Sequence, residues 1–328
     1  MTLSEPDILR FFDRQLQNWP EVQQRFDDLS YNVQTRDLQT GQLKLRIQFN
    51  PSRIRSTQAR IDRHSLELRP CFLCGKNRPP QQFSYPVGNK YLILVNPYPI
   101  LPLHLTIPTQ SHEPQKLSTL LDFIKLALSE LPDFLFFYNG ARCGASAPDH
   151  AHLQAVLKGE VPIERDWKYY ENKLEPLFHN ALSRQQNTLS DGIFSIRDYA
   201  CPALAALGDN RSLEPYLMRI LSALPVHAEN TEPDFNLLAW NASSPNASRM
   251  IAIVFPRQKH RPGCYFADGD AQRMISPGAL DMGGLLITPR QEDFLRTTAE
   301  NAKEIIKEVG VSTETFRQII TKIRQGRS

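Results

Sequence analysis

One stretch near the middle of the chain, residues 134–157, constrains the fold and the chemistry more than any other. It opens with aromatic and aliphatic side chains, Phe134–Tyr138, which predict a buried strand. A loop of small residues, Asn139–Pro148, follows, and a second strand is expected after it. Side chains two apart in a strand point to one face. Three polar side chains of the second strand have that spacing: His150, His152 and Gln154.

The small-residue loop is suited to phosphate groups. Glycine lets backbone N–H groups approach an anion closely, and serine adds a hydroxyl donor. A small loop beside a His-x-His-x-Gln face predicts a site where a phosphate bond is broken at a histidine. The residues expected to contact the phosphates are Asn139, Gly140, Gly144, Ala145 and Ser146.

The three polar side chains receive different predicted roles. Chemistry at phosphorus needs a nucleophile and donors for the non-bridging oxygens. Imidazole attacks through one free nitrogen when its other N–H is held by an acceptor. His152 is flanked on both sides, so it is the predicted nucleophile and Gln154 the predicted donor. His150 is expected to complete the catalytic set and to serve a metal as well.

Two cysteines indicate a metal site. Cys71 and Cys74 are spaced as Cys-x-x-Cys, which in a chain without a disulfide framework favours metal or redox chemistry. Zinc takes four thiolate or imidazole ligands. Adding His112, which follows a predicted strand, and His150 gives a four-ligand structural zinc site. The alternative is a pair of free thiols on a turn.

Basic residues offer further contacts for an anionic substrate. Arg53 belongs to a run of arginines after a predicted strand, and Arg257 and Lys259 follow another strand in the second half. Each group is either a solvated surface or a substrate contact. We include all three residues in the predicted substrate-binding set.

Composition narrows the class of protein. The 328 residues carry a formal net charge of +3, too small to argue for nucleic acid or an anionic membrane as partner. No apolar run reaches the roughly 20 residues that span a bilayer, and the first residues do not resemble a signal peptide. We therefore expect a cytoplasmic protein. The chain also contains no P-loop, Rossmann or nucleophile-elbow motif.

An internal echo predicts the architecture. Pro108 and His112 are spaced like Pro256 and His260, each set after an apolar strand. We therefore predict an α+β fold of two related halves with antiparallel sheets flanked by helices, divided as 1–190 and 191–328. The second half lacks the His-x-His-x-Gln and would be degenerate. Helices are expected in these ranges: 7–29 (two, broken at Pro20), 117–131, 158–190, 213–224, 291–309 and 313–325.

At these residues the sequence resembles the histidine triad superfamily. The resembling branch includes galactose-1-phosphate uridylyltransferase, diadenosine tetraphosphate phosphorylase and the GDP-hexose phosphorylases. The likeness covers roughly residues 45–290, and its most specific part is His150-Ala-His152-Leu-Gln154. Cys71 and Cys74 resemble the zinc pair of the uridylyltransferases.

The resemblance implies a nucleotidyltransferase that works by a ping-pong reaction. His152 would form a nucleotidyl-histidine with a nucleotide sugar or dinucleoside polyphosphate, and phosphate or a sugar 1-phosphate would accept the nucleotidyl group. Glutamine at position 154, where hydrolases of the superfamily have a third histidine, favours transfer. Two alternatives stay open: a nucleotide hydrolase of the same superfamily, and a protein that binds nucleotides without turnover.

Overall fold

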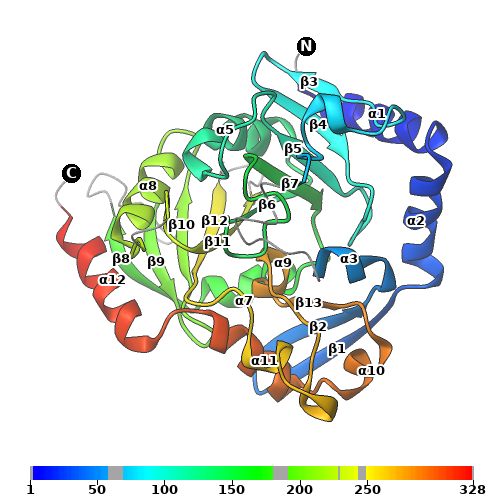
Figure 1. Ribbon diagram of the computed structural model, residues 1–328. Helices are drawn as coiled ribbons and strands as arrows, with labels where there is room; N and C mark the ends of the chain where they lie inside the picture. Colours follow the sequence, from blue (N-terminus) through cyan, green and yellow to red (C-terminus); the bar gives the residue numbers. More distant parts are fainter. Residues whose placement is uncertain (1–2, 58–68, 180–190, 228–229, 243–248, 327–328) are drawn as a thin grey trace.

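The computed structural model describes residues 3–57, 69–179, 191–227, 230–242 and 249–326. Its centre is a ten-stranded sheet in which every neighbouring pair is antiparallel (Figure 1). From edge to edge the strands are β3 (Tyr85–Val87), β4 (Tyr91–Val95), β5 (Leu105–Pro108), β7 (His152–Leu157), β6 (Phe134–Asn139), β11 (Phe235–Asn241), β12 (Met250–Pro256), β10 (Leu204–Gly208), β9 (Gly192–Ile196) and β8 (Leu174–His179).

The sheet contains the same unit twice. One unit runs β4, β5, α5 (Leu121–Glu130), β6 and β7, and the other runs β9, β10, α8 (Leu213–Ala223), β11 and β12. In space the strands follow 4-5-7-6 and then 11-12-10-9, so β6 and β11 pair at the centre. This arrangement confirms the α+β fold of two related halves.

The sequence echo that suggested the repeat does not mark equivalent positions. Pro108 ends β5, the second strand of its unit, whereas Pro256 ends β12, the fourth strand of its unit. The equivalent of β12 is β7. The prediction of a repeat is therefore right although the matched prolines are not counterparts.

The large sheet lies between two layers because its strands are apolar on both faces. Along β6, Phe134, Phe136 and Tyr138 point into one core, while Leu135 and Phe137 point into the other. The first face is covered by α1 (Glu5–Gln17), α2 (Pro20–Tyr31), α5, α8 and α12 (Thr313–Gln325). No helix in the described ranges is long and apolar enough to cross a bilayer.

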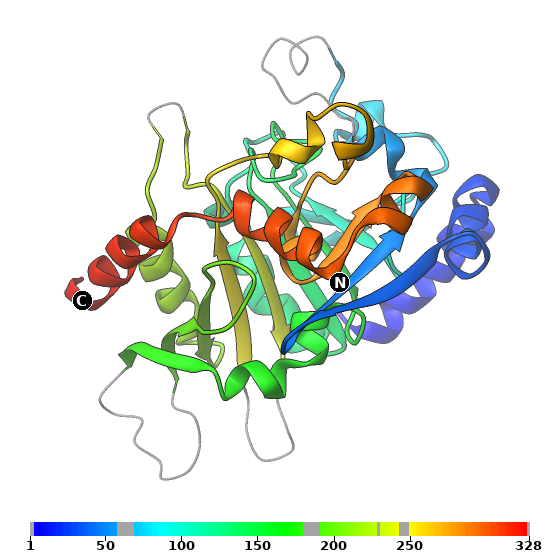
Figure 2. The same ribbon diagram turned by 90° about the horizontal axis from the view of Figure 1, so that it is seen from below.

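The second face carries a smaller sheet and short helices (Figure 2). The hairpin of β1 (Gln34–Thr40) and β2 (Leu43–Phe49) is joined by β13 (Leu285–Thr288), which runs parallel to β2. Alternating apolar and polar residues around Thr40-Gly41 predict this hairpin, but the expected first strand, Tyr31–Val33, is wrong: Tyr31 ends α2, and β1 begins at Gln34. The helices of this layer are α6 (Pro162–Arg165), α7 (Trp167–Glu171), α9 (Ala279–Met282), α10 (Gln291–Arg296) and α11 (Ala299–Val309).

Most predicted helices are confirmed, and the exceptions have local causes. Pro20 starts α2 at the position where a missing N–H costs nothing. The predicted helix over 291–309 is broken because the Thr298 side chain accepts a hydrogen bond from the Asn301 amide and starts α11 anew. The helix expected over 158–190 is wrong beyond residue 173, where β8 pairs with β9 instead. Residues 180–190 lie outside the described ranges.

Candidate active site

A cavity of about 890 Å³ lies on the second face of the large sheet, within the size range of small-molecule sites. Its floor includes Phe137 of β6 together with His152 and Gln154 of β7. Its walls come from parts of the chain far apart in sequence: the α1–α2 region, the loop after β6, and the segment 276–281 of the second half. The predicted nucleophile and donor therefore face one cavity.

His152 is held in one orientation at the first position of β7. Its Nδ1 lies 2.8 Å from the carbonyl oxygen of His150, so Nδ1 carries the proton and Nε2 keeps its lone pair. Burial lowers the pKa of His152 to about 4. The side-chain amide of Gln115 clamps its backbone, accepting from the His152 N–H and donating to the His152 carbonyl. A neutral, oriented imidazole with a free nitrogen results.

His104, whose role the sequence analysis missed, orients Gln154. The Ile100 N–H donates to Nδ1 of His104 at 3.1 Å, so the ring proton is on Nε2. That Nε2–H donates to Oε1 of Gln154 at 2.8 Å, and Asn96 donates to the same oxygen at 3.3 Å. With its oxygen engaged, Gln154 presents its NH₂ group to the cavity. Burial keeps His104 neutral by lowering its pKa to about 3.

The small-residue loop only partly forms the predicted cradle. Gly144, Ala145 and Ser146 line the cavity, and Gly144 adopts a φ of +96° that favours glycine. Gly140 does not line it. Its N–H donates to the carbonyl oxygen of Phe235, and a Cβ there would lie 2.8 Å from that oxygen. Gly140 thus allows close packing of β11 and leaves no free N–H for a phosphate.

Asn139 lines the cavity but its side chain has a second role. Its Oδ1 accepts from Asn236 of β11 at 2.9 Å and from the backbone N–H of Ala279 at 2.7 Å. Asn139 therefore fastens the segment 276–281 to the end of β6. If Asn139 also contacts a phosphate, as the sequence predicts, it does so in addition to this structural role.

Among the three predicted basic contacts, only Arg53 lines the cavity. Arg53 donates to the carbonyl oxygen of Tyr98 at 2.9 Å, and burial lowers its pKa to about 10, which leaves it charged at neutral pH. Arg257 is buried and donates to the carbonyl oxygens of Pro277 and His260, so it holds the loop after β12 in place. Lys259 is half exposed and pairs with Glu308.

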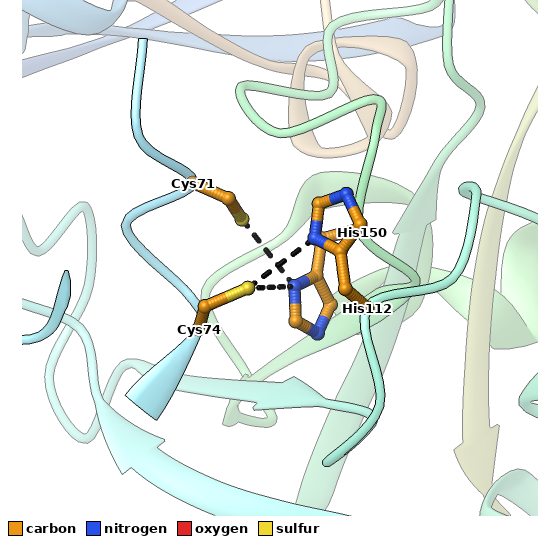
Figure 3. A group of neighbouring side chains, drawn as sticks. All are labelled: Cys71, Cys74, His112 and His150. Carbon is orange, nitrogen blue, oxygen red and sulfur yellow. Dashed lines mark hydrogen bonds between the residues drawn. The ribbon is translucent and has the colours of Figure 1, made fainter. Parts of the chain in front are cut away.

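Four side chains form a candidate metal centre (Figure 3). The Sγ of Cys71 lies 3.3 Å from Nδ1 of His150, and the Sγ of Cys74 lies 3.3 Å from Nδ1 of His112. All four ligand atoms lie within 4.8 Å of one another. Both sulfur–nitrogen distances are close to the roughly 3.5 Å that separates a thiolate sulfur from an imidazole nitrogen when both bind one zinc ion tetrahedrally. This cluster could bind a metal ion, and it contains all four residues that the sequence analysis combined.

His150 belongs to the candidate metal centre and also contacts His152, the predicted nucleophile. Nε2 of His150 donates to the carbonyl oxygen of Thr109 at 2.8 Å, which leaves Nδ1 free to bind a metal. The carbonyl oxygen of the same residue holds Nδ1 of His152. His150 lies just before β7, which begins at His152, and is not among the cavity-lining residues. The prediction that its side chain shares the face of His152 and Gln154 is therefore wrong.

Asp149 lies beside the metal centre. Its carboxylate is 3.8 Å from Nε2 of His112 and 3.4 Å from Arg69, whose Nη2 also donates to the carbonyl oxygen of Ser146 at 2.9 Å. Arg69 thereby links the turn that carries Cys71 and Cys74 to the small-residue loop. Asp149, the residue before His150, therefore helps to position this loop through its contact with Arg69.

Comparisons with known proteins agree with this arrangement. Residues 11–157 match the model of a family described as a domain of unknown function (DUF4922), and residues 179–326 match one described as a GDPGP1-like, C-terminal domain. Yeast Ap4A phosphorylase Apa2 in complex with AMP is 17% identical, with 89% of this chain and 96% of that chain covered, at a TM-score of 0.51. The complex with Ap4A gives the same identity and coverage at 0.50. No curated protein sequence matches.

The chain therefore has the fold of yeast Ap4A phosphorylase Apa2, and its second half is similar to a GDPGP1-like, C-terminal domain. These findings agree with the resemblance, seen in the sequence, to the branch of the histidine triad superfamily that includes galactose-1-phosphate uridylyltransferase, diadenosine tetraphosphate phosphorylase and the GDP-hexose phosphorylases.

Proposed function

We propose that this protein is a nucleotidyltransferase of the phosphorylase type that acts on a nucleotide sugar or a dinucleoside polyphosphate through a nucleotidyl-His152 intermediate. The observation that carries the proposal is the orientation of His152. Its Nδ1–H donates to the His150 carbonyl, and its ring lines the cavity, so the lone pair of Nε2 is available to a substrate bound there. A solved structure of the same fold contains Ap4A and another contains AMP, which supports a nucleotide substrate.

In the first half-reaction, the Nε2 lone pair of His152 attacks the α-phosphorus and forms a P–N bond. The P–O bond to the leaving sugar 1-phosphate or nucleoside polyphosphate breaks, and the leaving oxygen takes the electron pair. His152 keeps its Nδ1 proton, and the His150 carbonyl stabilises the positive charge that develops on the ring. In the second half-reaction, an oxygen of phosphate or a sugar 1-phosphate attacks phosphorus and His152 leaves as neutral imidazole.

The cavity provides donors for the phosphate oxygens. Gln154 directs its NH₂ group inward because His104 and Asn96 bind its oxygen, so it can donate to a non-bridging oxygen without reorganisation. Arginines add positive charge around the substrate phosphates. Those that line the cavity are Arg25, Arg53, Arg69 and Arg261.

We also propose that the metal centre holds a structural zinc ion. Two thiolates and two imidazole Nδ1 atoms are a donor set that zinc prefers, and His150 has the tautomer that metal binding requires. The ion would fix the Cys71–Cys74 turn against His150. His150 in turn orients His152 through its backbone carbonyl.

The test is His152→Asn, compared with His227→Asn as a matched control on an exposed histidine outside the cavity. Each protein is mixed with α-³²P-labelled nucleotide sugars or Ap4A, with and without phosphate. Wild type and control should form an acid-labile labelled protein and, with phosphate, release a nucleoside diphosphate. His152→Asn should lose the label and at least about 10³-fold in rate, as expected for removal of a nucleophile.

Two outcomes would contradict the proposal. Full activity of His152→Asn would remove His152 as the nucleophile. Release of nucleoside monophosphate at the same rate with and without phosphate would indicate a hydrolase instead.

A further inference from the structure

His260 lies in the loop that follows β12 and lines the same cavity as His152. The proposed transfer reaction assigns it no step. His260 belongs to the second half of the chain, whereas His152 belongs to the first. The ring of His260 contacts the backbone of Arg142 in the loop after β6. His260 is therefore anchored where the two halves meet around the cavity.

The contact with Arg142 fixes the tautomer of His260. Nδ1 lies 3.0 Å from the Arg142 carbonyl oxygen, which can only accept, so Nδ1 carries the proton. Nε2 then bears a lone pair. This atom is buried, and within the described part of the chain it has no hydrogen-bond partner. A buried acceptor without a partner in a ligand-sized cavity is the feature that needs an occupant.

The charge state of His260 limits what that occupant can be. Burial is the main cause that lowers its pKa to about 4, and the positive charges of Arg261, Arg257 and Arg142 act in the same direction. The ring is therefore neutral at neutral pH. A neutral lone pair repels phosphate oxygens and attracts an O–H or N–H donor.

The surroundings of His260 favour a sugar hydroxyl as this donor. Ser276 also lines the cavity, and its Oγ accepts from Nε of Arg261 at 3.1 Å, so its hydroxyl proton remains available to a ligand oxygen. A sugar hydroxyl can donate to Nε2 of His260 and accept from the hydroxyl of Ser276, so it matches both side chains. The aromatic side chains that line the cavity and suit a flat base come from other elements: Trp19, Phe72 and Tyr98.

We propose that His260 is a specificity-determining residue whose Nε2 accepts a hydrogen bond from a sugar hydroxyl of the substrate. The proposal rests on the proposed function, because a nucleotide-type substrate brings sugar hydroxyls into the cavity. The hydroxyl belongs either to the ribose of the nucleoside or to a hexose, and the two sources can be separated by the choice of ligand.

The experiment measures binding by calorimetry in a His152→Asn background, which prevents turnover. The probes are GDP-glucose, UDP-glucose, ADP-glucose and Ap4A. His260→Leu removes the acceptor, His260→Gln retains one, and His227→Leu is the control. We expect His260→Leu to weaken binding about three- to tenfold, as for one neutral hydrogen bond, with partial recovery in His260→Gln and no change in the control.

Smaller ligands identify the hydroxyl. If it belongs to ribose, His260→Leu weakens binding of AMP, GMP or UMP but not of their 2′,3′-dideoxy forms. If it belongs to a hexose, the effect appears with glucose 1-phosphate and the nucleotide sugars but not with the nucleoside monophosphates.

Two results would overturn the proposal while leaving the proposed function intact. In the first, the His260→Leu variant binds every probe with an affinity within twofold of the control. The other is an equal loss for dideoxy nucleotides and inorganic phosphate, which would indicate general damage to the cavity. If no probe binds even with His260 intact, the proposed function itself fails, and this inference fails with it.

Discussion

His152 and Gln154 reach the cavity from one strand, and each is held from behind by a different partner. The His150 carbonyl fixes the ring of His152, and the Nε2–H of His104 fixes the amide of Gln154. Both partners remove a choice that the free side chain would have: the tautomer of the imidazole and the direction of the amide. Such preorganisation lets donors stabilise a transition state without reorganising.

This arrangement predicts the effect of Gln154→Glu. The new carboxylate can still accept from His104, so the fold should be retained, but an oxygen replaces the NH₂ group that is proposed to donate to the substrate phosphate. We expect the rate of His152 labelling in single-turnover experiments to fall by roughly 10²–10³-fold, as for loss of one transition-state donor.

The matched control is Gln81→Glu, which adds the same charge elsewhere on the cavity wall. It should cost much less, because only general repulsion of the phosphates is added. Equal losses in the two variants would show that charge alone, and not the donor of Gln154, explains the effect.

A bound metal ion would matter most to the turn that carries Cys71 and Cys74. The regular structure of this turn is limited to the short 3₁₀ helix Gly75–Asn77, and its two thiols meet His112 and His150 from two other segments. A bound ion would replace the missing secondary structure, since ligands from three segments are then tied together.

We predict that the purified protein retains about one zinc ion per chain after washing with a chelator, as expected for a closed four-ligand site. Cys74→Ser should lose the metal, melt several degrees lower and label His152 more slowly, because His150 is no longer fixed. Metal analysis, thermal unfolding and the labelling rate measure these effects. Cys264→Ser, on a cysteine outside the cluster, is the control. Wild-type protein that is metal-free yet equally stable would remove the zinc site.

The sequence predicts some of these elements and residues well because their signals are local. The spacing of His152 and Gln154, and the four possible metal ligands Cys71, Cys74, His112 and His150, are visible without a fold. His104 is not, because its contact with Gln154 depends on the pairing of β5 with β7, where Thr106 lies opposite Gln154. Arg257 shows the converse limit. A basic residue after a strand has the same sequence signal whether it is solvated or, as here, buried against carbonyl oxygens.

At the scale of the whole molecule, the two halves form one sheet. Five residue pairs, from Asn236 with Asn139 to Trp240 with Leu135, join β11 to β6 at its centre. Asn139 accepts hydrogen bonds from Asn236 and from the Ala279 N–H, and Asn236 donates to the carbonyl oxygen of Cys143, which adds connections near one end of this junction. The second half thus supports the cavity even though it lacks the His-x-His-x-Gln.

We therefore predict that the proposed halves, 1–190 and 191–328, are not stable when produced separately. Each would expose β6 or β11 as a long apolar edge, which promotes aggregation. Produced together from two separate genes, they should assemble into a soluble complex with the labelling activity of the intact chain. Soluble yield and size-exclusion chromatography measure this. A monomeric single half with a sharp unfolding transition would contradict the prediction.

The unbroken pairing of β6 with β11 also bears on how ligands enter and leave. Two-domain enzymes commonly open by a hinge between their domains, but a hinge here would have to break the central ladder of the sheet. The entry of ligands must therefore depend on movements of the cavity lining itself, which includes residues of the α1–α2 region and of the loop after β12. Under the proposed function, turnover would then be limited by small movements of side chains and loops in that lining, while His152 and Gln154 stay fixed on β7 from one substrate to the next.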